Sequence, residues 1–179
     1  MSNYKSIIKG VRESDSRSQM MFYDLFFRPA YLSAYAITEN EHEAEEIAQD
    51  TMLKVFDRTD LLNDDAAAMG RIVRRIASNA AIDVIRRRKD FILQSENMPD
   101  SEAPEDDAAG YDFSVEDIRE GIAALSCAYR SILVLRLFED MSFAEVADAL
   151  KMNCSTVRVQ YTRGIVKLKE LLIKKKSYV

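Results

Sequence analysis

Apolar side chains recur every three or four residues over several stretches of this 179-residue chain, which is the spacing of amphipathic helices. The clearest stretch follows Asn40, where one face carries Ala44, Ile47, Ala48, Thr51, Met52 and Val55. Asn40 followed three residues later by Glu43 has the spacing of an N-cap with a capping box. The pattern predicts a helix from about Asn40 to Phe56.

Two neighbouring stretches show the same spacing. Upstream, an aromatic stripe that we expect in the core consists of Phe22, Leu25, Phe26, Tyr31, Leu32, Tyr35 and Ala36. Pro29 stands inside it and lacks the N–H that a helix interior needs, so we expect an interruption there. Downstream, a long helix is predicted from about Ala66 to Arg88, with an apolar stripe of Met69, Ile72, Val73, Ile76, Ala77, Ala80 and Val84.

The C-terminal third predicts three helices in close succession. Leu133, Val134 and Leu137 mark the first, and Ser142 with Glu145 forms a capping box at the start of a short second one. After polar residues at 151–154, a third helix should begin near Ser155 or Thr156 and turn inward the side chains of Val157, Tyr161, Ile165, Leu168, Leu171 and Leu172. A short capped helix, a turn and a longer basic helix form a helix-turn-helix.

Composition supports an all-α fold. The chain has only five Gly and three Pro, which are the residues that turn-rich β folds need. Residues 90–113 contain Pro99, Pro104 and many carboxylates without apolar periodicity, and we interpret them as an acidic, flexible linker. The sequence therefore predicts two small helical domains, at 1–89 and 114–179, of which the second carries the helix-turn-helix.

Several classes of protein are disfavoured. We find no signal-peptide pattern and no apolar run long enough for a membrane span, so we expect a cytoplasmic protein without membrane insertion. Cys127 and Cys154 are far apart and lack the spacing of a zinc site or a disulfide framework. Without a Gly-rich phosphate loop, and with His42 as the one histidine, we expect no enzyme, no cofactor, no metal and no small-molecule substrate.

Charge is strongly segregated along the chain. The net charge is −5, yet basic residues dominate 71–89 and 158–176, whereas 90–117 holds acidic residues and no Lys or Arg. Such segregation indicates two anion-binding surfaces joined by a segment that DNA would repel. Nucleic acid is thus a candidate partner in spite of the negative total.

Candidate DNA-binding residues lie in both basic stretches. In the first, Arg71, Arg75, Asn79 and Arg86 share one side of the predicted helix, as contact with a phosphate backbone requires. In the second, the start of the last helix offers Ser155, Thr156, Arg158, Val159 and Gln160 to base edges, and Arg163 and Lys167 to phosphates. A basic face exposed only to solvent, on an ordinary helical bundle, is the alternative in each case.

Three motifs in this order resemble the extracytoplasmic-function (ECF) sigma factors of bacterial RNA polymerase, in the sigma-70 family. Residues 43–52 resemble the family's acidic helix, residues 76–87 its helix for the minus-ten promoter element, and residues 129–136 with 142–147 the start of its minus-thirty-five domain. The resemblance implies that the chain recruits RNA polymerase to promoters, with core polymerase, promoter DNA and an anti-sigma factor as partners.

The resemblance also implies residue roles. Glu41, Glu45, Glu46, Gln49 and Asp50 would dock on the β′ clamp helices, and Arg87 would join the minus-ten surface. The loop 57–65 would capture a flipped base, the linker would thread through polymerase, and the C-terminal domain would meet the β flap. Since unstacking a base costs a few kcal/mol, a pocket and a cationic strand-binding face must both contribute.

The chain departs from the family pattern at a few positions. Ile72 stands where Trp is usual, and Lys151 occupies a turn position where Gly is common, so we expect Lys151 to be left-handed at a cost of about 1 kcal/mol. Val159 and Gln160 replace the usual Ser and Arg. Two rival interpretations stay open: a stand-alone helix-turn-helix regulator, and a sigma-like decoy that binds an anti-sigma protein.

Overall fold

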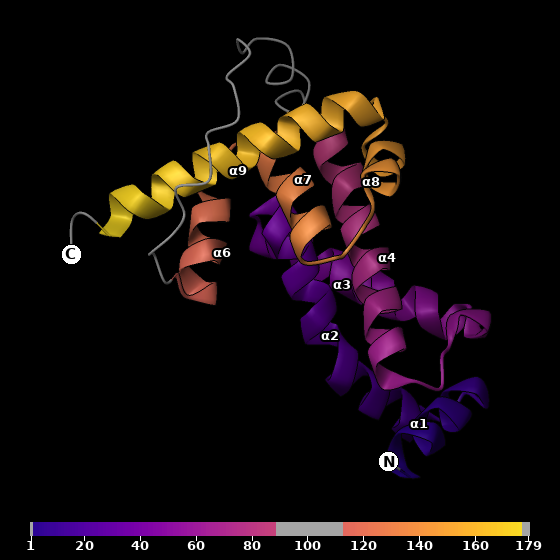
Figure 1. Cartoon of the computed structure of the whole chain (residues 1–179). Coiled ribbons are helices and arrows are strands. Elements are labelled where there is room, and N and C mark those ends of the chain that lie inside the picture. Colours follow the sequence, from indigo (N-terminus) through magenta and orange to yellow (C-terminus); the bar gives the residue numbers. More distant parts are fainter. Residues whose placement is uncertain (1, 89–112, 177–179) are drawn as a thin grey trace. The chain divides into compact units, whose positions relative to one another are not determined.

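The computed structural model describes residues 2–88 and 113–176, and every regular element in these ranges is a helix (Figure 1). The all-α prediction is confirmed. The described residues form two compact units, Met1–Val84 and Ile85–Val179. The linker predicted at 90–113 lies outside the described residues except for Phe113.

The first unit opens with α1 (Ser2–Arg12), a helix that we did not predict. Ile8 and Val11 are buried where α1 packs against α2 (Ser16–Thr38). Between the two helices Asp15 caps α2, because its Oδ2 accepts hydrogen bonds from the Ser18 N–H at 2.8 Å and the Ser18 hydroxyl at 2.6 Å. The hydroxyl bond is the main reason that the pKa of Asp15 is lowered.

Helix α2 runs through Pro29 without a break, so the predicted interruption is wrong. Phe22, Phe26, Ala30 and Ala34 are buried on one face across the proline, and this packing keeps the helix continuous although one backbone hydrogen bond is lost. The aromatic stripe is only partly core. Leu25 is 49% exposed, and Leu32 and Tyr35 are also exposed.

Helix α3 (Glu41–Asp57) follows the sequence prediction closely. Asn40 is its N-cap, with Oδ1 accepting from the Glu43 N–H at 3.1 Å. All six residues predicted for its apolar face are buried against the rest of the unit. A short 3₁₀ helix, η1 (Thr59–Leu61), and the long helix α4 (Ala66–Arg87) come next. In α4 the stripe residues Met69, Val73 and Ala77 are buried, whereas Ile72, Ile76, Ala80 and Val84 are half-buried.

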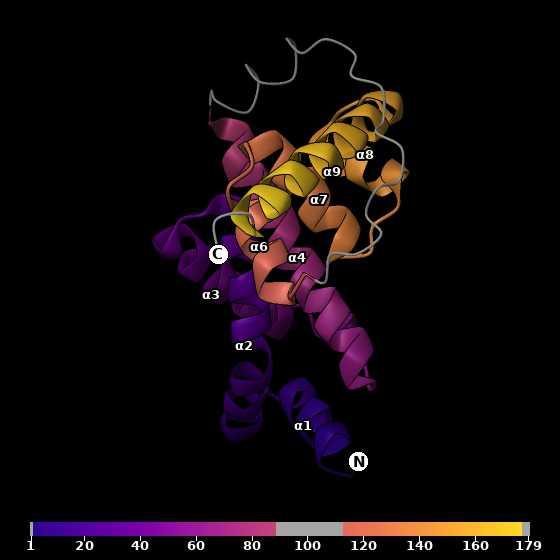
Figure 2. The same ribbon diagram turned by 60° about the vertical axis from the view of Figure 1, so that its left-hand side comes forward.

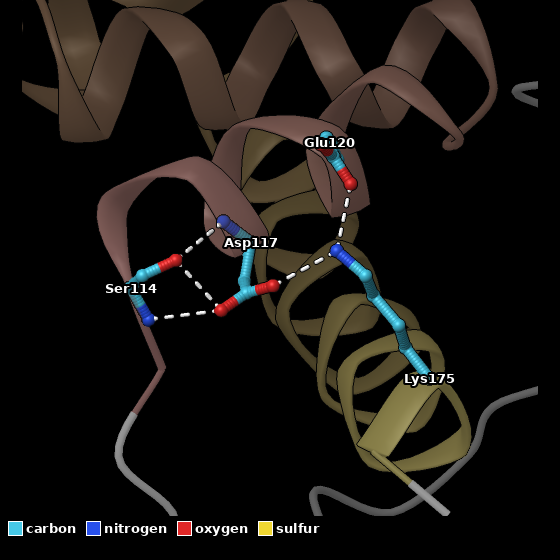
Figure 3. A network of polar contacts seen from close by, with 4 residues as sticks. All are labelled: Ser114, Asp117, Glu120 and Lys175. Atoms are coloured by element: carbon cyan, nitrogen blue, oxygen red, sulfur yellow. Dashed lines mark hydrogen bonds and ion pairs between the residues drawn. The ribbon is translucent and has the colours of Figure 1, made fainter. Parts of the chain in front are cut away.

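The first helix that lies wholly within the second unit is α6 (Val115–Ala123), which packs against α9 (Cys154–Lys176). A Cβ atom at Gly121 would lie 2.6 Å from Leu168 Cδ1, so glycine permits this close approach. Ser114 and Asp117 form a capping box, and the Lys175 Nζ donates to Asp117 at 2.8 Å and to Glu120 at 2.7 Å (Figure 3). The start of α6 is therefore tied to the last turn of α9.

Helix α7 (Cys127–Leu137) lies at the centre of this unit, with Ile132, Leu133 and Leu135 buried. The buried Arg130 donates from Nη1 to the carbonyl oxygens of Ala123 and Leu125, which satisfies the end of α6.

Helix α8 (Phe143–Leu150) starts at the predicted Ser142–Glu145 capping box. It ends at Lys151, whose φ of 54° is left-handed as expected. Helix α9 then runs unbroken to Lys176 (Figure 2), so short helix, turn and long helix agree with the predicted helix-turn-helix.

The buried face of α9 differs from the predicted one. Val157, Leu168 and Leu172 are buried as expected, but Tyr161 and Ile165 are only half-buried and Leu171 is exposed. Gln160 and Gly164 lie on the buried side instead. Gly164 approaches Leu133 and Tyr129 of α7, since a Cβ there would lie 3.4 to 3.5 Å from them. Gly164 thus lies on the side of α9 that faces α7.

Candidate functional surfaces

One side of α3 carries negative charge into solvent. All five residues that we assigned to polymerase docking are exposed, and we name them the acidic face: Glu41, Glu45, Glu46, Gln49 and Asp50. The Gln49 Nε2 donates to Glu45 Oε1 at 3.4 Å, a local contact along the helix. The position of Glu41 in the first turn also suits the positive end of the helix dipole.

Two residues missed by sequence reasoning border the acidic face. Leu53 is 60% exposed, four residues after Gln49 and three after Asp50. Tyr31 of α2 stacks on Tyr35 with ring centroids 5.9 Å apart. Burial, followed by the negative charge of Glu41, raises the pKa of Tyr31. Leu53 could have been found in the sequence, because it is an apolar residue outside the helix's buried stripe.

Helix α4 presents a second candidate surface, which we name the basic face. Arg71, Arg75 and Asn79 are exposed and spaced four residues apart, so they line one side of the helix. Arg87 is exposed near the helix end, and Arg86 is half-buried. Asp65 caps the helix, with Oδ1 accepting from the Ala68 N–H at 2.6 Å. The basic face thus presents guanidinium groups and one amide group to a ligand that lies along the helix.

The loop between α3 and α4 is held from a distant part of the sequence. The Tyr4 hydroxyl donates to the Asn63 carbonyl at 3.0 Å, and the Arg12 Nη2 donates to the Leu62 carbonyl at 3.3 Å. Arg12 also pairs with Asp64 at 3.1 Å. Burial, then the charges of Asp65 and Asp64, raise the pKa of Tyr4 to about 12. We name these contacts the α1 brace.

Within the same loop, Arg58 and Asp60 make a two-bond ion pair. The Arg58 Nε donates to Asp60 Oδ1 at 2.9 Å and its Nη2 donates to Oδ2 at 2.8 Å. These hydrogen bonds lower the pKa of Asp60 and raise the pKa of Arg58. The pair fixes the entry to η1 on the exposed side of the loop.

The start of α9 offers a third surface. Ser155, Arg158 and Val159 are exposed and Thr156 is half-exposed, and we name these four residues the leading end. The Arg158 guanidinium lies 5.0 Å from the centroid of the Phe143 ring of α8. The Arg136 guanidinium of α7 lies 4.5 Å from the same centroid, and Tyr161 packs edge-on against the ring at 5.3 Å.

Arg136 and Phe143 are residues that sequence reasoning missed. Arg136 also donates from Nη1 to the Met141 carbonyl, in the segment between α7 and α8. Cation–π contacts hold both guanidinium groups at one ring. The Phe143 ring of α8 therefore orients Arg158 before any ligand arrives.

Gln160 requires a correction. Its side chain is 4% exposed, because α9 turns it toward α7 beside Val157 and Gly164. The assignment of Gln160 as a reader of bases is therefore wrong. Among the described residues, none bonds to the Gln160 Oε1.

Arg163 and Lys167 lie further along α9, and both are half-buried. The Lys167 Nζ lies 5.0 Å from the centroid of the Tyr129 ring of α7. Lys167 is thus held at the flank of α9, near the buried side, whereas the leading end faces outward.

In residues 2–88 and 113–176 no three His, Cys, Asp or Glu side chains gather as a metal site would require. No helix in the same ranges combines the length and the apolar character of a membrane span. Cys127 and Cys154 are free cysteines.

Comparison with known families assigns both units. The sequence model of Sigma-70 region 2 matches residues 23–91, and that of Sigma-70 region 4 matches residues 116–168. Together the two matches cover more than half of the chain. The region 2 match contains the acidic and basic faces, and the region 4 match contains α8 and most of α9.

Similar proteins extend over nearly the whole chain. The ECF RNA polymerase sigma factor SigW of Bacillus subtilis is 28% identical over 181 residues, which cover 94% of this chain and 96% of SigW. The ECF RNA polymerase sigma factor RpoE of Cereibacter sphaeroides is 27% identical over 177 residues, which cover 94% of each chain.

Solved structures show the same fold. The sigma factor RpoE in complex with the anti-sigma factor NepR from Bartonella quintana superimposes with a TM-score of 0.52 at 18% identity, over 86% of this chain and 95% of that one. CnrH in complex with the cytosolic domain of CnrY superimposes with a TM-score of 0.53 at 18% identity, over 95% and 97%.

These findings define an all-α protein with a sigma-70 region 2 followed by a region 4. The chain belongs to the sigma-70 family, in its group of ECF RNA polymerase sigma factors, and its function is that of a transcription initiation factor.

Proposed function

We propose that this sigma factor joins core RNA polymerase through the acidic face of α3 and holds promoter DNA through the basic face of α4 and the leading end of α9. The observation that carries the proposal is the separation of charge: every residue of the acidic face is exposed on one helix, and most of the cations of the other two surfaces are exposed on two others. A polyanion is attracted to the second set and repelled by the first.

For polymerase, the proposed contact is with the β′ clamp helices. Exposed carboxylates spaced along one helix suit a basic helical partner, and charge complementarity of this kind speeds encounter and fixes orientation. Leu53 adds an apolar group at the border, so the interface combines charge with a small buried area. A second proposed contact is between the C-terminal unit and the β flap.

For DNA, we propose two elements. Arg71, Arg75, Asn79, Arg86 and Arg87 would hold the minus-ten strand, and the α1-braced loop at 57–65 would receive a flipped base. Ser155, Thr156 and Arg158 would face the minus-thirty-five duplex, with Arg163 and Lys167 near its phosphates. Such a protein needs no catalytic group and would work in the cytoplasm, where bacterial polymerase transcribes.

A first experiment mixes the purified chain with bacterial core RNA polymerase and measures complex formation and transcription from a promoter library. We expect a stable complex and transcripts that depend on promoter sequence. Binding to DNA but not to polymerase would favour the stand-alone regulator. Polymerase binding without transcripts would favour the decoy.

Charge reversal tests the acidic face. Glu45→Lys with Glu46→Lys should weaken the polymerase complex by about tenfold or more, since the charge pairs across the interface become repulsive. Glu13→Lys with Asp24→Lys is the matched control, because both residues are exposed in the same unit but lie outside the acidic face. Equal loss in the two double variants would contradict the assignment.

Salt dependence tests the phosphate contacts of α9. Arg163→Ala should weaken minus-thirty-five binding across sequences and reduce the salt slope by about one phosphate contact. Thr156→Ala should leave the slope unchanged, because a hydroxyl releases no counterion. An unchanged slope in Arg163→Ala would remove Arg163 from the phosphate-binding set.

An anti-sigma protein is a third proposed partner, after core polymerase and promoter DNA. Of the two superimposed structures, RpoE is in complex with the anti-sigma factor NepR, and CnrH is in complex with the cytosolic domain of CnrY. Co-purification of the chain from its own host, with and without added core polymerase, tests this proposal. A partner displaced by polymerase is the expected result.

A further inference from the structure

The outward side of α9 is not uniformly polar. Ser155, Val159, Thr162 and Val166 follow one another at intervals of four, three and four residues, which places them in one row. The buried residues Val157, Gln160 and Gly164 lie on the opposite side. Val159 is 45% exposed in this row, so a branched apolar side chain stands near the middle of the outward side.

The residues around Val159 suit a position that faces DNA. Arg158 comes directly before it and Arg163 follows four residues later, so cations lie near it on both sides. Arg158 contacts the Phe143 ring, and the exposure of Val159 shows that no neighbour covers it. The Thr162 hydroxyl already donates to the Arg158 carbonyl at 3.1 Å. Val159 is therefore a prominent apolar group offered by this part of the helix.

The chemistry of the major groove gives such a group one natural partner. Base edges there present hydrogen-bond donors and acceptors, and the thymine C5-methyl is the apolar exception. Valine cannot hydrogen-bond, so opposite guanine, adenine or cytosine it would cover polar atoms that lose water without compensation. Opposite thymine it buries a methyl group.

We propose that Val159 contacts the C5-methyl of a thymine in the minus-thirty-five duplex and thereby selects thymine at one base step. This inference rests on the proposed function of α9 as the helix that enters that duplex. It assigns a specificity-determining role to a residue whose chemistry is apolar rather than cationic.

The test uses holoenzyme assembled from the full chain and core RNA polymerase. A duplex library randomised over the upstream promoter element is selected for binding, and each thymine of the selected duplex is then replaced singly by deoxyuridine, which lacks only the methyl group. We expect one replacement to weaken binding by about fourfold, the value of one buried methyl group. The other replacements should change affinity little.

Variants then identify the protein side of the contact. In Val159→Ser the same deoxyuridine replacement should have no effect and the preference for thymine should relax, whereas Val159→Ile should retain both. Val166→Ser is the matched control, because it removes a valine from the same row seven residues later. Thermal unfolding of each variant checks that α9 is intact.

Two results would overturn the inference. In the first, no single replacement of thymine by deoxyuridine in the selected element weakens binding. In the second, deoxyuridine weakens binding equally in the wild type and in Val159→Ser. If Arg158→Ala and Arg163→Ala also left upstream-element binding unchanged, the proposed role of α9 would fail together with it. If those arginine variants lost binding as expected, only the role assigned to Val159 would fail.

Discussion

Each of the two basic helices is preceded by a short segment, and the two segments are held differently. Residues 58–65 before α4 contain the local Arg58–Asp60 pair and are also bonded by Tyr4 and Arg12, which lie more than 45 residues earlier in the chain. Residues 151–153 before α9 are fixed locally, with Met152 N–H bonded to the Ala147 carbonyl at 2.9 Å and Lys151 in a left-handed conformation.

The difference concerns what each segment depends on. The turn before α9 needs only residues of its own neighbourhood, so it should form whenever α8 and α9 form. The loop before α4 needs α1 in place, so a change in α1 should reach a surface far away in sequence. The surface at the start of α9 is thus preorganised by the helix-turn-helix alone. The surface on α4 is preorganised by the whole first unit.

The largest effect is expected from a clash at the corner between α1 and α2. In Gly10→Ala the new Cβ would lie 2.0 Å from Ser18 Oγ and 2.6 Å from Ser18 Cβ, so the helices must shift. We expect a loss of about 1–3 kcal/mol in the stability of the first unit and faster amide exchange in residues 58–65. Hydrogen exchange with mass spectrometry measures both.

Two companion variants sharpen that result. Gly70→Ala should be neutral or stabilising, because its Cβ would meet only ordinary contacts at 3.6 and 3.8 Å. Adding Ser18→Gly to Gly10→Ala removes the clashing Cβ and should recover part of the loss, because the hydroxyl bond to Asp15 is deleted with it. If exchange in the loop stays slow in Gly10→Ala, the loop does not depend on the placement of α1.

The second unit should respond to loss of the N-cap of α8, the helix that precedes the local turn. Ser142→Ala removes the side chain that accepts from the Glu145 N–H at 3.2 Å, and we expect the second unit to lose about 1 kcal/mol. Ser126→Ala is the control, because Ser126 stands at the N-cap of α7 without a side-chain cap bond. If chemical denaturation gave equal losses of unfolding free energy for the two variants, the Ser142 cap would contribute no more to stability than the uncapped position.

A smaller effect is expected for the α1 brace itself. Arg12→Ala deletes an ion pair whose side chains are largely exposed, so the stability of the first unit should fall by about 0.5 kcal/mol. Exchange in residues 58–65 should nevertheless accelerate, since the Leu62 carbonyl loses its donor. Lys9→Ala breaks the exposed Lys9–Glu13 pair in the same helix and should leave the loop unchanged.

The smallest effect concerns acid. The hydrogen bonds from Lys175 and Ser114 lower the pKa of Asp117 from its usual 3.8, so the carboxylate stabilises the folded state above that pH. This contribution should be lost as the pH falls below about 3.8. Asp117→Asn should flatten the acid limb of the unfolding profile of the second unit. An unchanged limb would show that the pair with Lys175 contributes nothing measurable.

The same contrast explains which features the sequence could predict. Asn40, the Ser142–Glu145 box and the left-handed Lys151 are signals contained within a few residues, and each was predicted correctly. The continuity of α2 through Pro29 depends on packing against other helices, which no local rule contains. The α1 brace joins residues far apart, so periodicity cannot indicate it.

Gln160 illustrates a different kind of failure. Apolar spacing alone allowed α9 to bury either Tyr161 and Ile165 or Gln160 and Gly164, and the aromatic and aliphatic pair was the expected choice. In the structure Gln160 and Gly164 are buried, and Gly164 lies at ordinary contact distance from α7. The candidate residues on α3 and α4 came from charge and resemblance, and their exposure is compatible with the roles proposed for them.

The link between Lys175 and Asp117 has a practical consequence for protein engineering. Ser114 stands just before α6, the first of the four helices α6 to α9, and the last turn of α9 is tied to that same corner (Figure 3). A domain whose entry and exit are neighbours can be inserted into a surface loop of another protein without stretching either connection. The segment from Ser114 to the end of α9 is therefore suited to insertion into a single surface loop of a host protein.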